Sequence, residues 1–202
     1  MVAGINYQRL NDALEYYTKV CRFIYKDVSW LVNEEISNIT KPEDRNNFFV
    51  KDKVLVASAE QSFLQELLSG DSLQYGENYV AITPCFRDEP VIDDLHSLFF
   101  MKIELFANIE SPKAGYEILD LYIRLARSFF AKCGINTIVK SNGEAFFSTD
   151  RVLSLASFDI LDEKTGIELG SYSFNKILSE VDMWVCGTGL AEPRFSAVLS
   201  KQ

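Results

Sequence analysis

The sequence predicts an α+β fold in which a mainly antiparallel β-sheet is flanked by helices. Two observations lead to this prediction. Apolar, strand-like segments are joined by short turns, several of them typical of hairpins, and helical patterns are interleaved with them along the chain. In addition, no internal repeat, low-complexity tract or linker rich in Pro, Gly or Ser divides the 202 residues. We therefore expect one domain spanning residues 1–202.

The first half of the chain alternates helical spacing with short apolar runs. Leu10, Ala13 and Tyr17 recur at helical spacing and predict an amphipathic helix over residues 8–22. A second helix is expected over residues 59–70, with Gly70 at its end. The other elements expected here are a strand over 23–32, a short helix over 32–39 before "TKPED", and a strand over 53–58.

The second half contains the clearest helix signal in the chain. The segment 111–134 begins with Ser111 as a cap and Pro112 in the first turn, and it ends at Gly134. Before it, two apolar segments separated by a polar tip predict a pair of strands over 78–87 and 97–107. The remaining expectations are strands near 135–140, 154–161, 166–174 and 181–187, and a helix from about 191 to the end.

Charge and composition limit the classes of function. The net charge is −9 and the basic residues are scattered, which disfavours extensive RNA or DNA binding, because phosphate contacts need a basic face. No apolar run is long enough to cross a membrane, and "MVAGINYQRL" lacks the basic and apolar regions of a signal peptide. We expect a cytoplasmic protein with no membrane association. Four widely spaced cysteines in apolar contexts are expected to be buried, reduced thiols: Cys21, Cys85, Cys133 and Cys186.

A polar group interrupts the two apolar segments of the predicted strand pair. Arg87 at the end of the first strand, with Glu89 two residues later, offers a rigid fork for phosphate. On the returning segment His96, Phe100 and Glu104 are spaced by four residues, so a strand would place them on one face. Phe100 could then stack on a base and Glu104 could accept hydrogen bonds from an ammonium or hydroxyl group. The alternative is a solvated hairpin tip with Phe100 in the core.

A second group of candidate residues lies near the C-terminus. In "WVCGTGLAEPR" an apolar strand is followed by Gly187 and Gly189, and Arg194 falls in the first turn of the last predicted helix. Glycines at a strand end allow a ligand to approach the backbone closely, and the arginine supplies a second cation.

These stretches resemble the catalytic core of class II aminoacyl-tRNA synthetases. "CFRDE…HSLFFMKIE" resembles the second motif of that family, an FRxE followed by HxxxFxxxE, and "GTGLAEPR" resembles the third. The form GxGLAxxR, together with "TPCFR", is most similar to the seryl branch. The predicted helix over 8–22 and the strand after it occupy the place of the first, dimer-forming motif. "ASAEQSFLQEL" resembles the loop that contacts the substrate amino group, and "GIELGSYS" resembles the strand that holds the catalytic metal.

The resemblance implies a site for ATP. Arg87 would bind the α-phosphate, and Phe100 would stack on the adenine with Arg194 on its other face. Arg194 would also reach the γ-phosphate of a bent nucleotide, so Arg87 and Arg194 are the expected catalytic residues. Glu89 would lie near the adenine amino group and His96 near the triphosphate. The full expected ATP-binding set is Arg87, Glu89, His96, Phe100, Gly187, Gly189 and Arg194.

The resemblance also implies sites for an amino acid and for Mg²⁺. Ser58, Glu60 and Glu104 would contact the ammonium group of the amino acid, while Glu168 and Ser171 would hold the metal. Each assignment has an ordinary structural alternative. Glu60 could be a first-turn carboxylate of a helix, His96 a surface residue, and Glu168 with Ser171 an exposed strand edge.

Two departures from the family pattern shape the expected function. The first motif ends here in Ser29 and Trp30 instead of a proline, yet we still expect a homodimer. The whole chain resembles catalytic core, with no tRNA-selecting domain, and the loop at Asp93 and Asp94 is acidic. We therefore expect activation of an amino acid with ATP and transfer to an acceptor other than, or in addition to, tRNA, such as a carrier-protein thiol, another protein or a small amine. The alternatives are a non-catalytic ATP- or amino-acid-binding regulatory module, and a minimal synthetase that acts with a partner chain.

Overall fold

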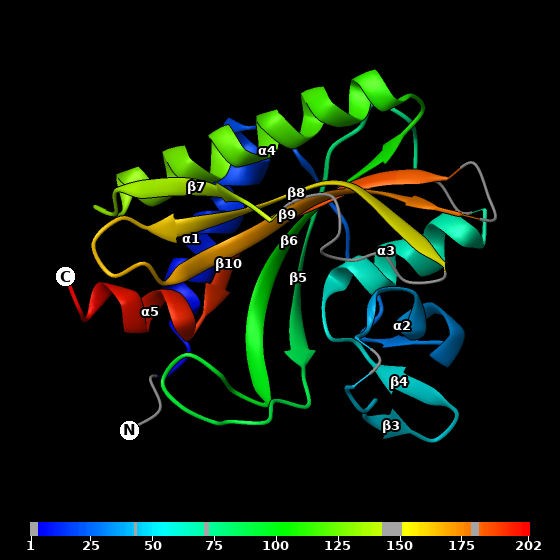
Figure 1. Cartoon of the computed structure of the whole chain (residues 1–202), viewed down its shortest axis with the longest axis horizontal. Coiled ribbons are helices and arrows are strands. Elements are labelled where there is room, and N and C mark those ends of the chain that lie inside the picture. The colour runs from blue at the N-terminus through cyan, green and yellow to red at the C-terminus, as the bar shows by residue number, and fades with distance from the viewer. Residues whose placement is uncertain (1–3, 43, 71–72, 143–150, 179–181) are drawn as a thin grey trace.

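One large sheet organises the computed structural model, which describes residues 4–42, 44–70, 73–142, 151–178 and 182–202. Its seven strands lie in the order β1-β5-β6-β10-β9-β8-β7, and every pair except β1–β5 is antiparallel (Figure 1). The mainly antiparallel α+β fold predicted from the sequence is therefore confirmed. The strands are β1 (Ile24–Tyr25), β5 (Tyr79–Phe86), β6 (Phe99–Ile109), β7 (Thr137–Ser141), β8 (Val152–Asp162), β9 (Glu168–Ile177) and β10 (Met183–Glu192).

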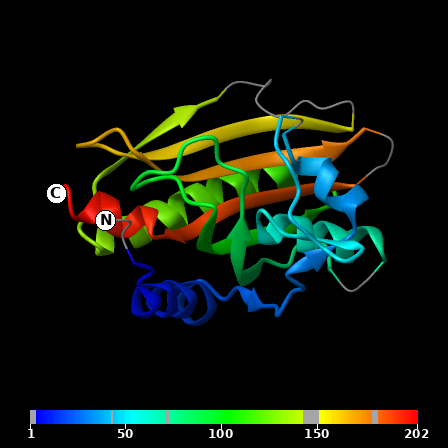
Figure 2. The same ribbon diagram turned by 90° about the horizontal axis from the view of Figure 1, so that it is seen from below.

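Helices and a small sheet cover the two faces of the large sheet. The long helix α4 (Pro112–Lys132) and α1 (Tyr7–Glu15) pack on one face, and α3 (Ala59–Leu68) packs on the other (Figures 1 and 2). The remaining elements are α2 (Glu34–Thr40), α5 (Arg194–Leu199) and a three-stranded sheet of β2 (Leu31–Val32), β4 (Lys53–Leu55) and β3 (Phe49–Val50). No helix in the described part of the chain is both long and apolar enough to span a membrane.

Alternating side chains on the central strands build two separate cores. On β6, Leu105 packs with the α1 and α4 side, whereas Phe106 packs with the α3 side. On β10, Val185 packs with the α1 and α4 side and Trp184 packs with the α3 side. This is the two-residue period of a strand that is covered on both faces. The central strands are consequently fixed from both sides, which gives rigid support to polar side chains near their ends.

Helix α4 has the ends that the sequence predicts. The hydroxyl of Ser111 accepts a hydrogen bond from the backbone N–H of Ala114 at 3.4 Å, and Gly134 follows the last turn with φ +84°. Within the helix, a Cβ at Gly115 would lie 2.2 Å from the ring of Phe174 on β9. Glycine at that position lets the helix approach the sheet closely.

Four predicted elements differ from the structure. The strand expected over 23–32 is instead two short strands, because the chain leaves the large sheet after Tyr25 and joins the small sheet at Leu31. The C-terminal helix begins at Arg194 and not near residue 191, because β10 continues to Glu192, which pairs with Met101 of β6. The first helix passes into a π-helical turn at residues 16–20. The strand expected from residue 181 begins at Met183, and residue 181 itself lies outside the described residues.

An ion pair connects the first helix to the end of β10. Arg9 Nη1 lies 2.7 Å from Oε1 of Glu192, whose side chain is completely buried. The same guanidinium nitrogen donates to the hydroxyl of Ser196 at 2.6 Å. A buried carboxylate that loses its cation still carries the free-energy cost of its removal from water. Removal of the arginine alone should therefore destabilise the fold by more than the intact pair stabilises it.

We expect Arg9→Met to lower the free energy of unfolding by about 3 kcal/mol. The methionine retains the apolar stem but leaves Glu192 without its cation. Arg124→Met is the matched control, because Arg124 pairs with Asp120 on the exposed face of α4, where an ion pair contributes about 0.5 kcal/mol or less. Urea denaturation of the two variants measures both values. If both variants lose the same free energy of unfolding, the burial of Glu192 does not add to the cost of removing its cation.

Candidate functional site

A cavity of about 370 Å³ lies on the face of the large sheet that carries α3 and the small sheet. Its wall is built from β5, β6, β9 and β10, from the start of α3 and from the loop between α2 and β3. Nearly all the candidate residues identified from the sequence line this one cavity, although they come from segments far apart in the chain. They are Ser58, Glu60, Arg87, Glu89, His96, Phe100, Glu104, Glu168, Ser171 and Arg194.

Strand register explains this convergence. Glu104 of β6 lies opposite Thr188 of β10, and Cys186 of β10 lies opposite Ser173 of β9. Alternate residues on each strand face the same way, so one polar face runs across three neighbouring strands. The residues that this face contributes to the cavity wall are Phe100, Lys102 and Glu104 from β6, Trp184, Cys186 and Thr188 from β10, and Ser171, Ser173 and Asn175 from β9.

Arg87 and Phe100 form one unit at the end of the β5–β6 pair. The guanidinium carbon of Arg87 lies 5.0 Å from the centre of the Phe100 ring, within the range of a cation–π contact. Arg87 Nε donates to the carbonyl oxygen of Ala57 at 3.3 Å, and the side chain forms no ion pair with any described residue. The backbone N–H of Arg87 donates a hydrogen bond to the carbonyl oxygen of Leu98, which fixes the backbone at this position. This cation therefore retains free N–H donors beside an aromatic face.

Arg194 differs from Arg87 because it forms an ion pair with an acidic side chain. Its Nη1 is 3.3 Å from Oε1 of Glu168, and its Nε donates to the carbonyl oxygen of Leu95 at 3.3 Å. The sequence places Glu168 with the metal and Arg194 with the nucleotide, whereas the structure pairs the two with each other. Both side chains remain partly exposed to the cavity, so a ligand could compete for either.

Asp159 joins Glu168 and Ser171 on the same wall. It lies directly across from Ser171 in the β8–β9 register and lines the cavity. Burial raises the pKa of Asp159, and the nearby negative charge of Glu168 raises it further. Sequence reasoning missed Asp159, since no motif contains it and the pairing of β8 with β9 was needed to find it.

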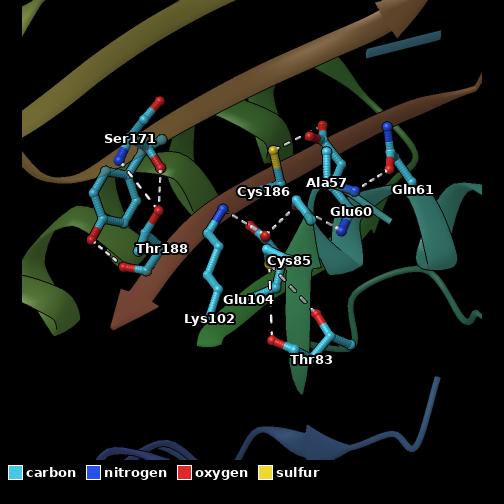
Figure 3. A network of polar contacts seen from close by, with 12 residues as sticks. Ala57, Glu60, Gln61, Thr83, Cys85, Lys102, Glu104, Ser171, Cys186 and Thr188 are labelled. Atoms are coloured by element: carbon cyan, nitrogen blue, oxygen red, sulfur yellow. Dashed lines mark hydrogen bonds and ion pairs between the residues drawn. The ribbon is translucent and has the colours of Figure 1, made fainter. Parts of the chain in front are cut away.

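The cavity wall contains a buried ion pair on β6 (Figure 3). Lys102 Nζ lies 2.6 Å from Oε2 of Glu104, and the hydroxyl of Ser58 donates to the same oxygen at 2.5 Å. Burial raises the pKa of Glu104, with Lys102 opposing the rise and Glu60 adding to it. Burial alone would lower the pKa of Lys102, but the attraction of Glu104 reverses the direction and raises it. Lys102 was also missed, although its spacing of two from Glu104 places it on the same strand face.

Glu60 extends this network to β10 (Figure 3). Its Oε1 accepts a hydrogen bond from the thiol of Cys186 at 3.1 Å, which Figure 3 draws. The same oxygen accepts a second hydrogen bond from Trp184 Nε1 at 2.7 Å. Burial and then the charge of Glu60 raise the pKa of Cys186 well above its usual value, so this thiol remains a donor. Glu60 is thus oriented into the cavity by two buried groups instead of facing solvent as an ordinary first-turn carboxylate.

The four cysteines agree only in part with the prediction. All are free thiols, and Cys85 and Cys186 are buried as expected. Cys21 and Cys133 are only partly buried, because they lie at the ends of the π-helical turn and of α4.

His96 and Glu89 belong to the loop between β5 and β6, which Figure 2 shows in front of the sheet. The expectation that His96 shares a strand face with Phe100 and Glu104 is wrong, because β6 begins only at Phe99. His96 Nδ1 lies 2.8 Å from Asp93 Oδ1, and both side chains are exposed. Glu89 lies 4.0 Å from Arg45, a cavity residue that carries no motif and that sequence reasoning did not find.

Gly187 and Gly189 do not line the cavity, and packing explains both. A Cβ at Gly187 would lie 2.3 Å from the ring of Tyr172, the residue opposite it on β9. A Cβ at Gly189 would lie 2.7 Å from Ile103 and 2.8 Å from Tyr17. Both contacts belong to the core beneath α1 and α4. The close approach that these glycines allow is therefore to aromatic side chains of the core.

Comparison with known proteins identifies the fold. No family model and no curated protein sequence matches the chain. The structure is similar to cytoplasmic serine-tRNA ligase from Naegleria fowleri in complex with AMP (TM-score 0.70, 17% identity, 93% of this chain and 47% of that one). It is also similar to seryl-tRNA synthetase from Pyrococcus horikoshii complexed with ATP (0.69, 17%, 91% and 48%) and to pyrrolysyl-tRNA synthetase from Desulfitobacterium hafniense (0.72, 14%, 98% and 70%).

These similarities show that the chain has the fold of a class II aminoacyl-tRNA synthetase catalytic domain. Sequence identities of 14–17% establish the fold alone. The chain spans about half the length of the seryl enzymes and about 70% of the pyrrolysyl enzyme.

Proposed function

We propose that the protein activates an amino acid with ATP to form an aminoacyl-adenylate. The observation that carries the proposal is the arrangement of one cavity. It presents a guanidinium without an ion pair among the described residues against an aromatic ring, Arg87 on Phe100. It also holds a partly buried carboxylate at Glu60 and a buried one at Glu104. The first pair is suited to a nucleotide and the second to an ammonium group. Two structures with the same fold contain AMP or ATP.

In the proposed reaction the carboxylate oxygen of the amino acid attacks the α-phosphorus of ATP. The new P–O bond forms as the bond to pyrophosphate breaks, and no protein nucleophile or proton transfer is required. Catalysis then rests on positioning and on stabilisation of charge. Arg87 would hold the α-phosphate beside the adenine that Phe100 stacks, and Arg194 would leave Glu168 to contact the triphosphate. Glu60, Glu104 and Ser58 would hold the ammonium group.

The donor set on β8 and β9 fits Mg²⁺. Glu168, Ser171 and Asp159 provide two carboxylates and a hydroxyl on one wall, and oxygen is the ligand that Mg²⁺ prefers. Among the described residues no three His, Cys, Asp or Glu side chains form a metal site by themselves. These residues would therefore hold the ion together with phosphate oxygens and water. Bound there, it would neutralise charge on the departing pyrophosphate.

The acceptor proposed is not tRNA but a carrier-protein thiol, another protein or a small amine. Asp93 and Asp94 are exposed on the loop beside the cavity, and negative charge there would repel an RNA backbone. A partner chain that supplies an RNA-binding surface would change this expectation. A second candidate function is a regulatory module that binds ATP or an amino acid without catalysis. The ion pair of Arg194 with Glu168 favours it, because that pair must open before either group meets a ligand.

Amino-acid-dependent ATP–pyrophosphate exchange tests the proposal. Each of the twenty amino acids is assayed with the full chain, ATP, Mg²⁺ and labelled pyrophosphate. We expect exchange that depends on one amino acid or on a few related ones. If no amino acid supports exchange while calorimetry still detects ATP binding, the regulatory module becomes the better description.

We further propose that the protein forms a homodimer through the segment that resembles the first motif. Strand β1 is an edge of the large sheet, and Ile24, Tyr25 and Trp30 expose 42%, 46% and 53% of their surface. Native mass spectrometry at micromolar concentration should give twice the 23.0 kDa chain mass, and Trp30→Glu should shift the protein to monomer. A wild-type monomer under these conditions would contradict the proposal.

A further inference from the structure

At one end of the cavity the sheet contributes side chains that are uncharged, and most of them are polar. Asn175 and Ser173 of β9 line it together with Trp184 and Cys186 of β10 and Val152 of β8. The carboxylate nearest in the network, Glu60, is engaged by Trp184 and Cys186 through one oxygen. This end is distinct from the side of Arg87 and Arg194, where cations suit a triphosphate. If the ammonium group of an amino acid contacts Glu60 and Glu104, its side chain would extend toward this end of the cavity.

The register places two further polar side chains of β8 next to this end, although they do not line the cavity themselves. Ser154 lies opposite Asn175 in the β8–β9 pairing, and Ser157 lies opposite Ser173. All four side chains are at least nine-tenths buried, with exposures of 1%, 4%, 2% and 8% respectively. On the opposite face of the same strands the buried side chains are apolar and belong to the core beneath α4.

Three buried atoms of this group have no hydrogen-bond partner among the described residues: Oδ1 of Asn175, Oγ of Ser154 and Oγ of Ser157. Asn175 Nδ2 donates to Ser173 Oγ at 2.8 Å, and Ser173 Oγ lies 3.2 Å from Cys186 Sγ. The amide is therefore held in place by its nitrogen while its carbonyl oxygen remains unsatisfied beside the cavity. Buried polar atoms are almost always paired, so an unsatisfied one next to a cavity is available to hydrogen-bond a ligand group.

We infer that the amino acid taken by this site has a neutral side chain ending in a hydroxyl or carboxamide group that hydrogen-bonds Asn175. The inference rests on the proposed amino-acid activation and specifies its substrate class. A hydroxyl or carboxamide both donates and accepts, so it matches the Asn175 amide in either of its two orientations. An acidic side chain would find no cation among the described residues of this end, and a basic one would compete with the ammonium group for Glu60. An apolar side chain would leave the Asn175 carbonyl unpaired.

The rejection of apolar analogues should be strong. A site built to hydrogen-bond a substrate group discriminates against an analogue without it far better than an apolar pocket discriminates between sizes. The pairs compared are serine with alanine, which lacks the hydroxyl group, threonine with the isosteric valine, and asparagine with the isosteric leucine. For the best substrate we expect exchange at a kcat/KM roughly 100-fold above its apolar partner.

Two measurements on the full chain test the inference. Exchange is measured for these pairs, for glutamine and for the charged amino acids. Calorimetry then measures binding of the same amino acids with a non-hydrolysable ATP analogue present. Asn175→Leu should remove the preference for the polar member of each pair and leave binding of the ATP analogue intact. Asn108→Leu is the matched control, because Asn108 is also buried on β6 with an unpartnered Oδ1 but does not line the cavity.

The outcomes separate this inference from the proposed function. Exchange that is best with a charged or apolar amino acid would overturn the substrate class and support activation. Selective binding of a neutral polar amino acid without exchange would support the substrate class and overturn catalysis. No binding and no exchange with any amino acid would overturn both. If Asn175→Leu still prefers the polar member of each pair, Asn175 does not determine the selectivity.

Discussion

Arg87→Ala is expected to lower amino-acid-dependent ATP–pyrophosphate exchange by about 1000-fold. Removal of one preorganised donor to developing charge costs about 100- to 1000-fold in enzymes that act by electrostatic stabilisation. Arg87 also lies against Phe100, so its loss would loosen the ring expected to stack on adenine. Stability should change little, because the side chain forms a single hydrogen bond to Ala57 and no ion pair with a described residue.

Arg87→Lys divides the effect into charge and geometry. Lysine retains the charge but loses the planar fork and its stacking on the ring, so we expect exchange to remain at least tenfold below wild type. Arg124→Ala, on the exposed face of α4, is the control and should not change exchange. The thermal midpoint of each variant confirms that the fold is intact. Wild-type exchange in Arg87→Ala would exclude this residue from phosphate binding.

Much of the fold and site could be predicted because local patterns coincide with strand periodicity. Phe100 and Glu104 lie on one face because they are four residues apart on a real strand, and both line the cavity. Helix α4 could be bounded by its cap and by Gly134. Arg194 could be placed because the turn after β10 brings the start of α5 to the same cavity.

The predictions that are wrong concern positions whose surroundings are determined by tertiary structure. His96 has the right spacing but lies before β6 begins, so periodicity does not apply to it. Gly187 and Gly189 follow a pattern typical of ligand approach, yet the atoms next to them belong to Tyr172, Ile103 and Tyr17. A sequence pattern indicates that a position needs glycine but not which neighbour requires it.

Residues such as Asp159, Arg45 and Asn175 could be found only from the structure. Asp159 and Asn175 reach the cavity through the register of β8 with β9 and of β9 with β10. Arg45 reaches it because its loop packs on the tip of the β5–β6 pair, where its Nη1 donates to the carbonyl oxygen of Asp88 at 2.7 Å. Strand order and loop packing are long-range properties, and no local pattern in this sequence encodes them.

Lys102→Met is expected to lower the free energy of unfolding at pH 7 by about 3–5 kcal/mol, the usual cost of breaking a buried ion pair on one side. Glu104 is 1% exposed, and after the change it would keep its hydrogen bond from Ser58 but lose its cation. Denaturant titration measures the loss. The double variant Lys102→Met, Glu104→Gln should recover much of it, because no unpaired charge then remains.

The pH dependence separates this electrostatic cause from a simple loss of packing. Burial already raises the pKa of Glu104 above its usual 4.5, and Lys102 opposes that rise. In Lys102→Met the folded-state pKa therefore moves further upward. A raised pKa gives stability that is fully present below the unfolded value and is lost as pH rises through the folded one. The deficit of the variant relative to wild type should consequently be largest at pH 7 and should shrink as pH falls toward about 4.5. A deficit that is the same at pH 7 and pH 5 would instead attribute the loss to packing of the lysine stem.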